Sequence, residues 1–385
     1  MMGLRISGAV LLATLSLLTA RAETGDVIDY SIHQQYVSPR ALGMGNAFVG
    51  LADDYNALFY NPAGLARLEE AEINLGISGG FDSKFPKFYN DIKGVSGSKS
   101  TQDMVNLLTN NNGNYYSMRA TVGGIWARPK WAFAIIPVDV EMKLSIHQLQ
   151  GESIDLVGNQ DTTIAYGRGW DVHWFKQDRM SLGFTTKAIY RAHYNTSIGA
   201  GDLAINPNLL RSQNVQEGFS ADTDFGMLYS MKVSDGSFMR FLRPSIGFTV
   251  RNVFDYGFPT NMHFIDKQSA GSPPKLGRRY DLGTAWELPD FWIFKTRAMA
   301  DLRDVSAPNY TVSKGLHFGA EFLWKVTSWW QGGWRMGTNQ GYFTAGFTGL
   351  FGMLQLDLVT YAEEMGTSNN PIPSRRYVVK ASLDW

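Results

Sequence analysis

The sequence predicts an all-β fold, a 14-stranded antiparallel transmembrane β-barrel with an N-terminal plug, or hatch, of short helices. Three observations predict it. Segments of about ten residues alternate between apolar and polar side chains. The connections between these segments alternate between long and short. A compact, glycine-punctuated segment, "RALGMGNAFVGLADDYNALFYNPAGLARL", precedes the first of them.

The alternation is clearest at the C-terminus, where Tyr377, Val379, Leu383 and the final Trp385 share one face of a strand. Each such segment is close to the length that a tilted strand needs to cross a bilayer. We expect strands at residues 71–80, 117–127, 130–144, 162–175, 180–194, 221–233, 243–253, 277–288, 291–303, 314–326, 328–337, 340–349, 352–362 and 374–385.

The connections predict two different ends. Loops of roughly 36, 17, 26 and 23 residues alternate with turns of roughly two to nine. An outer-membrane barrel has long outer loops and short periplasmic turns, and an even strand number brings both ends of the barrel sequence to one side. The alternative is a secreted β-sandwich or propeller, in which nothing would enforce ten-residue strands or two unlike ends.

The first residues predict export. Arg5, an apolar run from Ile6 to Thr19 and Ala20-Arg21-Ala22 form the pattern of a signal peptide. We therefore divide the chain into a signal peptide (1–22), a hatch or plug (23–70) and a transmembrane β-barrel (71–385), and place it in the bacterial outer membrane. The chain has 35 basic and 35 acidic residues, and removal of Arg5 and Arg21 with the signal peptide leaves a net charge of about −2. A net charge this close to zero excludes nucleic acid as a partner.

The sequence of residues 39–68 predicts short capped helices. Asp53 and Asp54 are candidate caps for a helix through Tyr60, and Asn61-Pro62 caps a second turn. Here the chain resembles the FadL-type outer-membrane transporter superfamily, including its PorV-like branch. The hatch residues that carry this resemblance are Arg40, Gly43, Met44, Gly45, Ala47, Asp53, Asp54, Asn61, Pro62, Ala63, Gly64 and Leu65. The resemblance implies that this segment lodges inside the barrel.

Two functions follow from the resemblance. The FadL branch moves long-chain fatty acids or other hydrophobic molecules, so the implied partners are membrane lipids and a hydrophobic small-molecule ligand. The PorV-like branch does not transport and docks an outer-membrane or secreted protein partner. Pro137 favours transport. A proline inside a strand interrupts the hydrogen-bond ladder. FadL-type barrels, which this chain resembles, have a kinked third strand that opens the wall sideways. Pro137 equally fits a simple bulge or strand end.

Two further groups are candidate ligand contacts. The first long loop offers capture residues that either form an apolar groove or pack the loop over the barrel mouth: Phe81, Phe85, Phe88, Tyr89, Met104, Leu107 and Leu108. The lumen charges Lys187, Arg191 and Arg251 either meet a carboxylate head group or balance Asp281, Glu321 and Asp357 as internal ion pairs.

Enzymatic chemistry is not expected. The chain has no cysteine, and its six histidines lack metal-ligand spacing, so we expect no cofactor and no metal. Gly76-Ile77-Ser78-Gly79-Gly80 matches G-x-S-x-G, but no helix follows it. A catalytic triad assembled from distant strands is the remaining enzymatic alternative.

Overall fold

A computed structural model describes residues 31–98, 100–147, 152–173, 178–206, 215–231, 244–265, 271–327, 329–367 and 369–385. The expected signal peptide, residues 1–22, lies outside the described residues, as does the start of the expected hatch.

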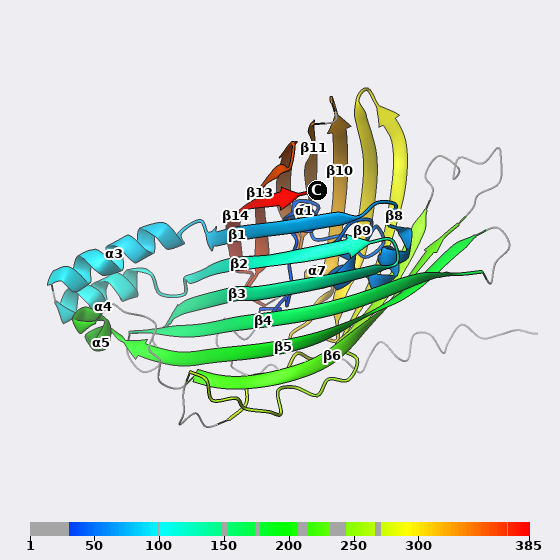
Figure 1. The fold of residues 1–385 in the computed structure, drawn as a ribbon. Coiled ribbons are helices and arrows are strands. Elements are labelled where there is room, and N and C mark those ends of the chain that lie inside the picture. The colour runs from blue at the N-terminus through cyan, green and yellow to red at the C-terminus, as the bar shows by residue number, and fades with distance from the viewer. Residues whose placement is uncertain are drawn as a thin grey trace, which may run out of the picture.

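The protein is a closed antiparallel barrel (Figure 1). Each strand pairs with its neighbours in sequence, and β1 closes the ring on β14. The strands are β1 (Glu72–Asp82), β2 (Tyr115–Arg128), β3 (Trp131–His147), β4 (Ser153–Val172), β5 (Arg179–Gly199), β6 (Val215–Ser230), β7 (Ser245–Arg251), β8 (Arg279–Phe291), β9 (Phe294–Val305), β10 (Leu316–Lys325), β11 (Trp330–Asn339), β12 (Tyr342–Phe351), β13 (Leu354–Glu364) and β14 (Pro373–Asp384). All fourteen expected strands form.

The two faces of the wall differ in chemistry because side chains alternate along each strand. Inward side chains on β5 include the buried Lys187 and Arg191. Outward side chains are large, apolar and exposed on strands all around the ring: Leu75, Ile135, Ile164, Phe225, Phe248, Leu282, Phe318, Trp334, Phe343, Leu358 and Val379. An apolar exposed band of this extent is typical of a surface that meets lipid.

The wall has uneven height. β4 and β5 are 20 and 21 residues long, whereas β7 has seven. β4 begins nine residues before its expected start at 162, so the long loop expected before it is mostly strand. The strand extends further than expected because it carries a second apolar surface. Leu144, Ile146, Ile154 and Leu156 are buried, although they point away from the lumen.

Helices α3 (Phe85–Ser98), α4 (Thr101–Asn110) and α5 (Ala200–Ile205) bury that second surface. They gather at one end of the long strands (Figure 1). The buried residues of β3 to β5 in this cluster alternate with the lumen charges, so the helices cover the outer face of the wall, above the band of exposed apolar side chains. No helix in the described part of the chain is both long and apolar enough to cross a membrane.

The segment before β1 lies inside the ring. It contains α1 (Pro39–Gly43), α2 (Ala57–Tyr60) and the 3₁₀ helix η2 (Pro62–Arg67). α1 contacts β11 to β14 and η2 contacts β3 to β6, on opposite parts of the wall. We call residues 39–68 the hatch. A further short helix, α7 (Val312–Gly315), precedes β10.

Candidate functional site

Asn61 joins the hatch to the barrel wall. Its side-chain amide donates to the carbonyl oxygens of Val49 (2.9 Å) and, on β6, Met227 (3.0 Å). Its Oδ1 accepts the backbone N–H of Ala63 (3.2 Å) and caps η2, with Pro62 at the first helical position. One fully buried side chain thus fixes the turn and its docking, because an amide can donate and accept at the same time.

Arg40 forms the centre of a buried ion network between the hatch and the wall. It bonds both oxygens of Glu321 on β10 (2.8 and 2.7 Å), Asp53 (2.8 Å) and Asp54 (2.7 Å). Arg297 on β9 also pairs with Asp53. Burial favours a raised pKa at Asp53, but Arg40 and Arg297 attract its negative charge and lower the pKa below its usual value. Burial raises the pKa of Asp54, against the opposing effect of Arg40.

Inward-facing glycines let the hatch backbone touch the wall. A Cβ at Gly283 would lie 2.7 Å from the backbone nitrogen of Gly50, and one at Gly183 would overlap the carbonyl group of Pro62. Between β4 and β12 the wall glycines in such contact with the hatch backbone are Gly169, Gly183, Gly226, Gly247, Gly283, Gly319, Gly337 and Gly346. Gly167 instead faces the side chains of Leu58 and Leu65. On β9, Asp301 accepts the backbone N–H groups of Phe48 and Val49 (2.6 and 2.7 Å). We call β4 to β12 the fixed arc.

Pro137 interrupts the ladder on both sides of β3. The register to β2 shifts between Val122 and Gly124, and the register to β4 shifts between Ile136 and Asp139. The carbonyl oxygen of Pro137 accepts a side-chain bond from Thr162 (2.8 Å). Because proline lacks the N–H that a ladder needs, the strand bulges here.

Next to this bulge, two cavities meet across the wall. A groove of about 510 Å³ on the outer face is lined by apolar side chains of β1, β2, β3, β13 and β14, with Pro137 at its edge. We call it the outer groove. On the inner face, a cavity of about 40 Å³, the window cavity, reaches the same place. Gly76 and Gly123 line both, and they face each other in the β1–β2 ladder. This pair therefore contributes no side chain of its own to the wall, and the neighbouring Lys380 and Ile136 side chains lie against it. We call Gly76, Gly123 and Pro137 the window.

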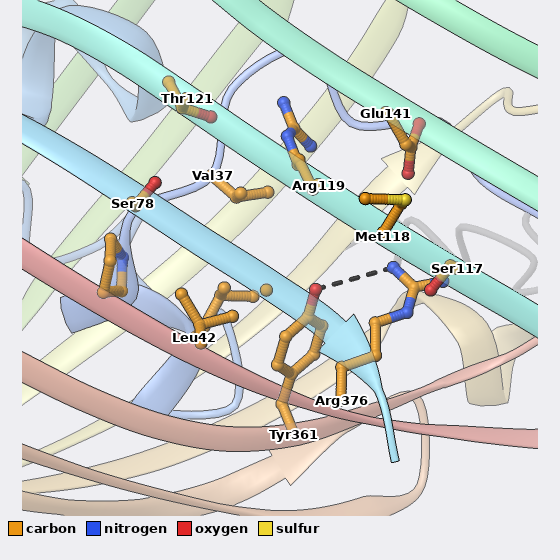
Figure 2. A pocket seen from close by; sticks show the side chains of 13 residues that line it. Val37, Leu42, Ser78, Ser117, Met118, Arg119, Thr121, Glu141, Tyr361 and Arg376 are labelled. Carbon is orange, nitrogen blue, oxygen red and sulfur yellow. Dashed lines mark hydrogen bonds between the residues drawn. The ribbon is translucent and has the colours of Figure 1, made fainter. Parts of the chain in front are cut away.

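Two more cavities extend from the window toward the end that carries α3 to α5. The upper cavity, about 20 Å³, shares Val37, Pro39, Ser78 and Thr121 with the window cavity (Figure 2). The mouth chamber, about 270 Å³, is polar and lies beyond it.

The extended segment Ser31–Val37 lies between the mouth chamber and the inner cavities. Side chains hold it to the wall: Ser31 accepts from Lys143 (2.9 Å), and His33 contacts Glu141 (2.7 Å). No ladder hydrogen bond fixes this part of the described chain, because it belongs to no strand.

The expected lumen charges all point inward and all have partners. Lys187 pairs with Asp224 (2.8 Å). Arg191 pairs with Asp161 (2.6 Å) and lines the mouth chamber. Arg251 also lines it, and pairs with Asp281 and Asp304 (2.6 Å each).

The two expected acids have partners as well. Glu321 belongs to the Arg40 network. Asp357 accepts from Thr348 and from Gln355 (2.8 Å).

The expected capture residues lie on the outside of the wall and not over the mouth. Phe88, Met104 and Leu108 are buried in the cluster between α3, α4, α5 and the strands. Phe85 and Leu107 are half-buried against it. Phe81 and Tyr89 are exposed. Five of the seven expected capture residues therefore pack in one cluster on the outer face of the wall.

Sequence reasoning missed Gly76, Gly123 and the segment Ser31–Val37. The glycines stand in "NLGISGG" and "TVGGIW", and an inward-facing glycine in a strand is a signal of close approach or of a thin wall. The pairing that places Gly76 opposite Gly123 depends on the register across a 32-residue connection, which no local pattern specifies.

No known family model matches the chain, and no curated protein matches it. Solved structures do. A toluene transporter of Ralstonia pickettii, TbuX, is 10% identical, with a TM-score of 0.44, over 90% of this chain and 98% of that one. A Pseudomonas putida toluene transporter, TodX, is 9% identical, with a TM-score of 0.43, over 89% and 96%. A Pseudomonas aeruginosa FadL homologue is 8% identical, with a TM-score of 0.39, over 91% and 98%. The last of the three is named as a homologue of FadL, the transporter type that the sequence resembles. At these scores the fold assignment rests on the chain's own strand pairing.

Proposed function

We propose that the protein is an outer-membrane channel for hydrophobic small molecules, such as long-chain fatty acids, which releases its cargo sideways into lipid at the window. One observation carries this proposal. An inner cavity and an apolar outer groove meet at Gly76 and Gly123, beside the bulge at Pro137.

The membrane location is supported by the outward face of the wall. Exposed apolar side chains occur on strands all around the ring, and an aqueous protein rarely leaves more than a few hundred Å² of contiguous apolar surface uncovered. A closed sheet satisfies its backbone hydrogen bonds without an edge, as hydrocarbon requires.

Energetics favour a sideways exit for such a cargo. Moving a sixteen-carbon chain from an apolar site into water exposes about fourteen methylenes and costs on the order of 11 kcal/mol. Movement from the same site into lipid avoids nearly all of that penalty. A hydrophobic cargo therefore leaves much faster through the wall than through an aqueous end.

Release requires the hatch, or the segment before it, to move. The upper and window cavities hold about 20 and 40 Å³, which is room for only one or two waters. Val37 and Pro39 line both, so a shift of this short stretch would join them into one passage. We propose that cargo arriving from the mouth chamber drives that shift.

The rival proposal is a docking barrel that transports nothing. The observation that favours it is the packed bundle of α3, α4 and α5 on the outer face, which presents a rigid surface beyond the membrane band. In that case the partner is a protein, and the window is a closed bulge.

Uptake of a labelled fatty acid by cells separates the two. Pro137→Val supplies an N–H to the ladder and should lower uptake at least about fivefold, the effect of one added hydrogen bond on a barrier. The matched control is Pro289→Val, because Pro289 is also exposed, also in a strand and also at a register shift, on β8. Equal uptake by the parent and Pro137→Val would remove the side exit. No uptake by the parent at any chain length would favour docking.

A further inference from the structure

The upper cavity has two sides of different chemistry. The hatch and the segment before it contribute apolar groups from Val37, Pro39 and Leu42. The wall side contributes hydroxyl and guanidinium groups beside the apolar Met118 and Val378, with Ser117 and Arg376 toward one end of the cavity and Ser78 toward the other (Figure 2). A cavity with one apolar and one hydrogen-bonding side suits an amphiphilic molecule better than a pure hydrocarbon.

Two hydroxyl groups on the wall side have unused hydrogen-bonding capacity. Ser117 is 2% exposed, and its Oγ has no hydrogen-bond partner among the described residues. The Tyr361 hydroxyl accepts a long hydrogen bond, 3.5 Å, from Arg376. A hydroxyl donates one hydrogen bond and accepts up to two, and a buried one left unpaired is costly. A ligand polar atom placed beside either group would supply the missing hydrogen bond.

The charged groups of the cavity are already balanced. Arg119 forms two bonds with Asp139 (2.8 and 2.6 Å). Arg376 pairs with Glu363 (2.9 Å).

Glu141, the acid on the cavity wall, pairs with Lys143 (3.4 Å) and contacts His33 (2.7 Å). A carboxylate brought into this cavity would be one negative charge in excess, and burying an unpaired charge is strongly unfavourable.

We propose that the upper cavity is a binding site for a neutral polar group, such as a hydroxyl, phenol or carbonyl, at the head of a small amphiphile. The inference rests on the proposed transport function and narrows its substrate class. Ser117 and Tyr361 hold the polar head. The apolar tail lies along Val37 toward Ser78 and Thr121, which also line the window cavity. The polar head stays hydrogen-bonded while the tail enters the window first.

Three photoaffinity probes test this site. They share one eight-carbon, diazirine-bearing chain and differ only at the end: an alcohol, a carboxylate or a plain hydrocarbon. Labelling is measured on the full chain in native membranes, and the labelled peptides are identified by mass spectrometry. The alcohol probe should label residues 31–42 or 115–128 at a half-saturating concentration at least about fivefold below those of the other two probes, the effect of one hydrogen bond.

Two variants and one control locate the effect. Ser117→Ala and Tyr361→Phe should each raise the half-saturating concentration of the alcohol probe about fivefold and leave that of the hydrocarbon probe unchanged. Ser220→Ala is the control, because Ser220 is a buried serine on β6 that lines none of the four cavities described above. Heat-dependent gel mobility checks that each barrel is folded.

The outcomes separate this inference from the proposed function. Tightest labelling by the carboxylate probe, or equal shifts for all probes in Ser117→Ala, would overturn the neutral-head site. Uptake of the hydrocarbon probe is measured in the same cells. Discrimination in labelling without any uptake would leave the site standing and remove the transport proposal. Uptake of the hydrocarbon probe without any difference in labelling among the three probes would leave the transport proposal standing and remove the neutral-head site.

Discussion

The hatch meets the barrel wall in two different ways. Along the fixed arc, from β4 to β12, hatch backbone lies against wall glycines, and Asp301 accepts two hatch N–H groups. Along β1 to β3, β13 and β14 the hatch backbone bonds to the wall near the β2–β3 turn, where Lys130 donates to the Leu65 carbonyl (2.7 Å) and Tyr55 donates to Glu72 (2.9 Å). Elsewhere on that side the upper and window cavities lie between the side chains of the two parts. None of the nearest neighbours of Gly76 or Gly123 belongs to the hatch.

This difference determines where the molecule can open. Backbone contact through glycine leaves no side chain that can rotate away, so the fixed arc can yield only by moving whole strands. The opposite side can yield by rotating a few side chains around Val37 and Pro39. We therefore expect the proposed motion of the hatch to open the protein toward the window.

The largest expected effect is a branched side chain on the fixed arc. Gly183→Val would drive a side chain into the carbonyl of Pro62, which is backbone and cannot swing aside. We expect a loss of about 3 kcal/mol or more in the free energy of unfolding, measured by urea titration in lipid vesicles.

Gly79→Val is the matched control for that substitution. Gly79 is also a strand glycine, but nothing lies within 4 Å of its missing Cβ. Equal stability of Gly183→Val and Gly79→Val would mean that the arc is not fixed.

Loss of Arg40 should have the next largest effect. Arg40→Met leaves Asp53, Asp54 and Glu321 buried with fewer partners, and we expect a loss of about 2 to 3 kcal/mol in the free energy of unfolding. The loss stays below that of an isolated pair because Glu321 keeps Arg335 (2.8 Å) and Asp53 keeps Arg297. Arg168→Met is the control, because Arg168 is exposed. An unchanged unfolding curve for Arg40→Met would show that the network contributes no net stability.

A branched side chain at the window should affect uptake more than stability. A Cβ at Gly76 meets the flexible end of Lys380 (2.8 Å) and the Cβ of Ser382 (2.8 Å), so Gly76→Val should cost about 1 kcal/mol of stability. The same side chain fills the thin wall, and we expect uptake of a labelled fatty acid to fall about tenfold. Gly79→Val again serves as control and should transport normally. A larger loss of uptake in Gly79→Val than in Gly76→Val would mean that the exit lies elsewhere in the wall.

The sequence predicts the strands well because their cause is local. Lipid on one side and a polar lumen on the other impose a two-residue period, and that period is visible in every strand near the membrane band. The prediction was wrong for the start of β4, where the outward residues Ile154 and Leu156 face helices. There the apolar face is set by a partner from elsewhere in the chain, which a local pattern does not reveal.

The candidate site shows the same limit. The effect of Pro137 can be predicted from the sequence alone, because the missing N–H of proline interrupts the hydrogen-bond ladder of any strand. The window also needs Gly76 opposite Gly123, and the cavities need the packing of Val37 against the wall. Both depend on long-range register and docking. Arg40, Asp53 and Asn61 were found through resemblance, whereas their partners Glu321, Arg297 and Met227 lie on three different strands.

The smallest expected effect is the response of the fixed arc to acid, which Asp53 and Asp54 should change in opposite directions. The pKa of Asp53 is lowered in the folded protein, so its contribution to stability is complete above the unfolded value, about 4, and is lost as pH falls through the lower folded value. The pKa of Asp54 is raised, so protonation at low pH relieves an unfavourable buried charge. Arg40 faces both acids. Arg297 and Glu321 face Asp53, whereas Asn56 and Glu72 face Asp54.

Unfolding free energies at pH 7 and pH 3 test this opposition. The drop between the two should shrink by about 1 kcal/mol in Asp53→Asn, because that variant has lost the acid whose protonation weakens the arc. The drop in unfolding free energy should grow in Asp54→Asn, because that variant has lost the acid whose protonation stabilises the folded protein. The two asparagine variants keep the shape of the site and control for each other. Shifts of the same sign would mean that the two carboxyl groups titrate as one unit, and would contradict the opposed contributions of Asp53 and Asp54.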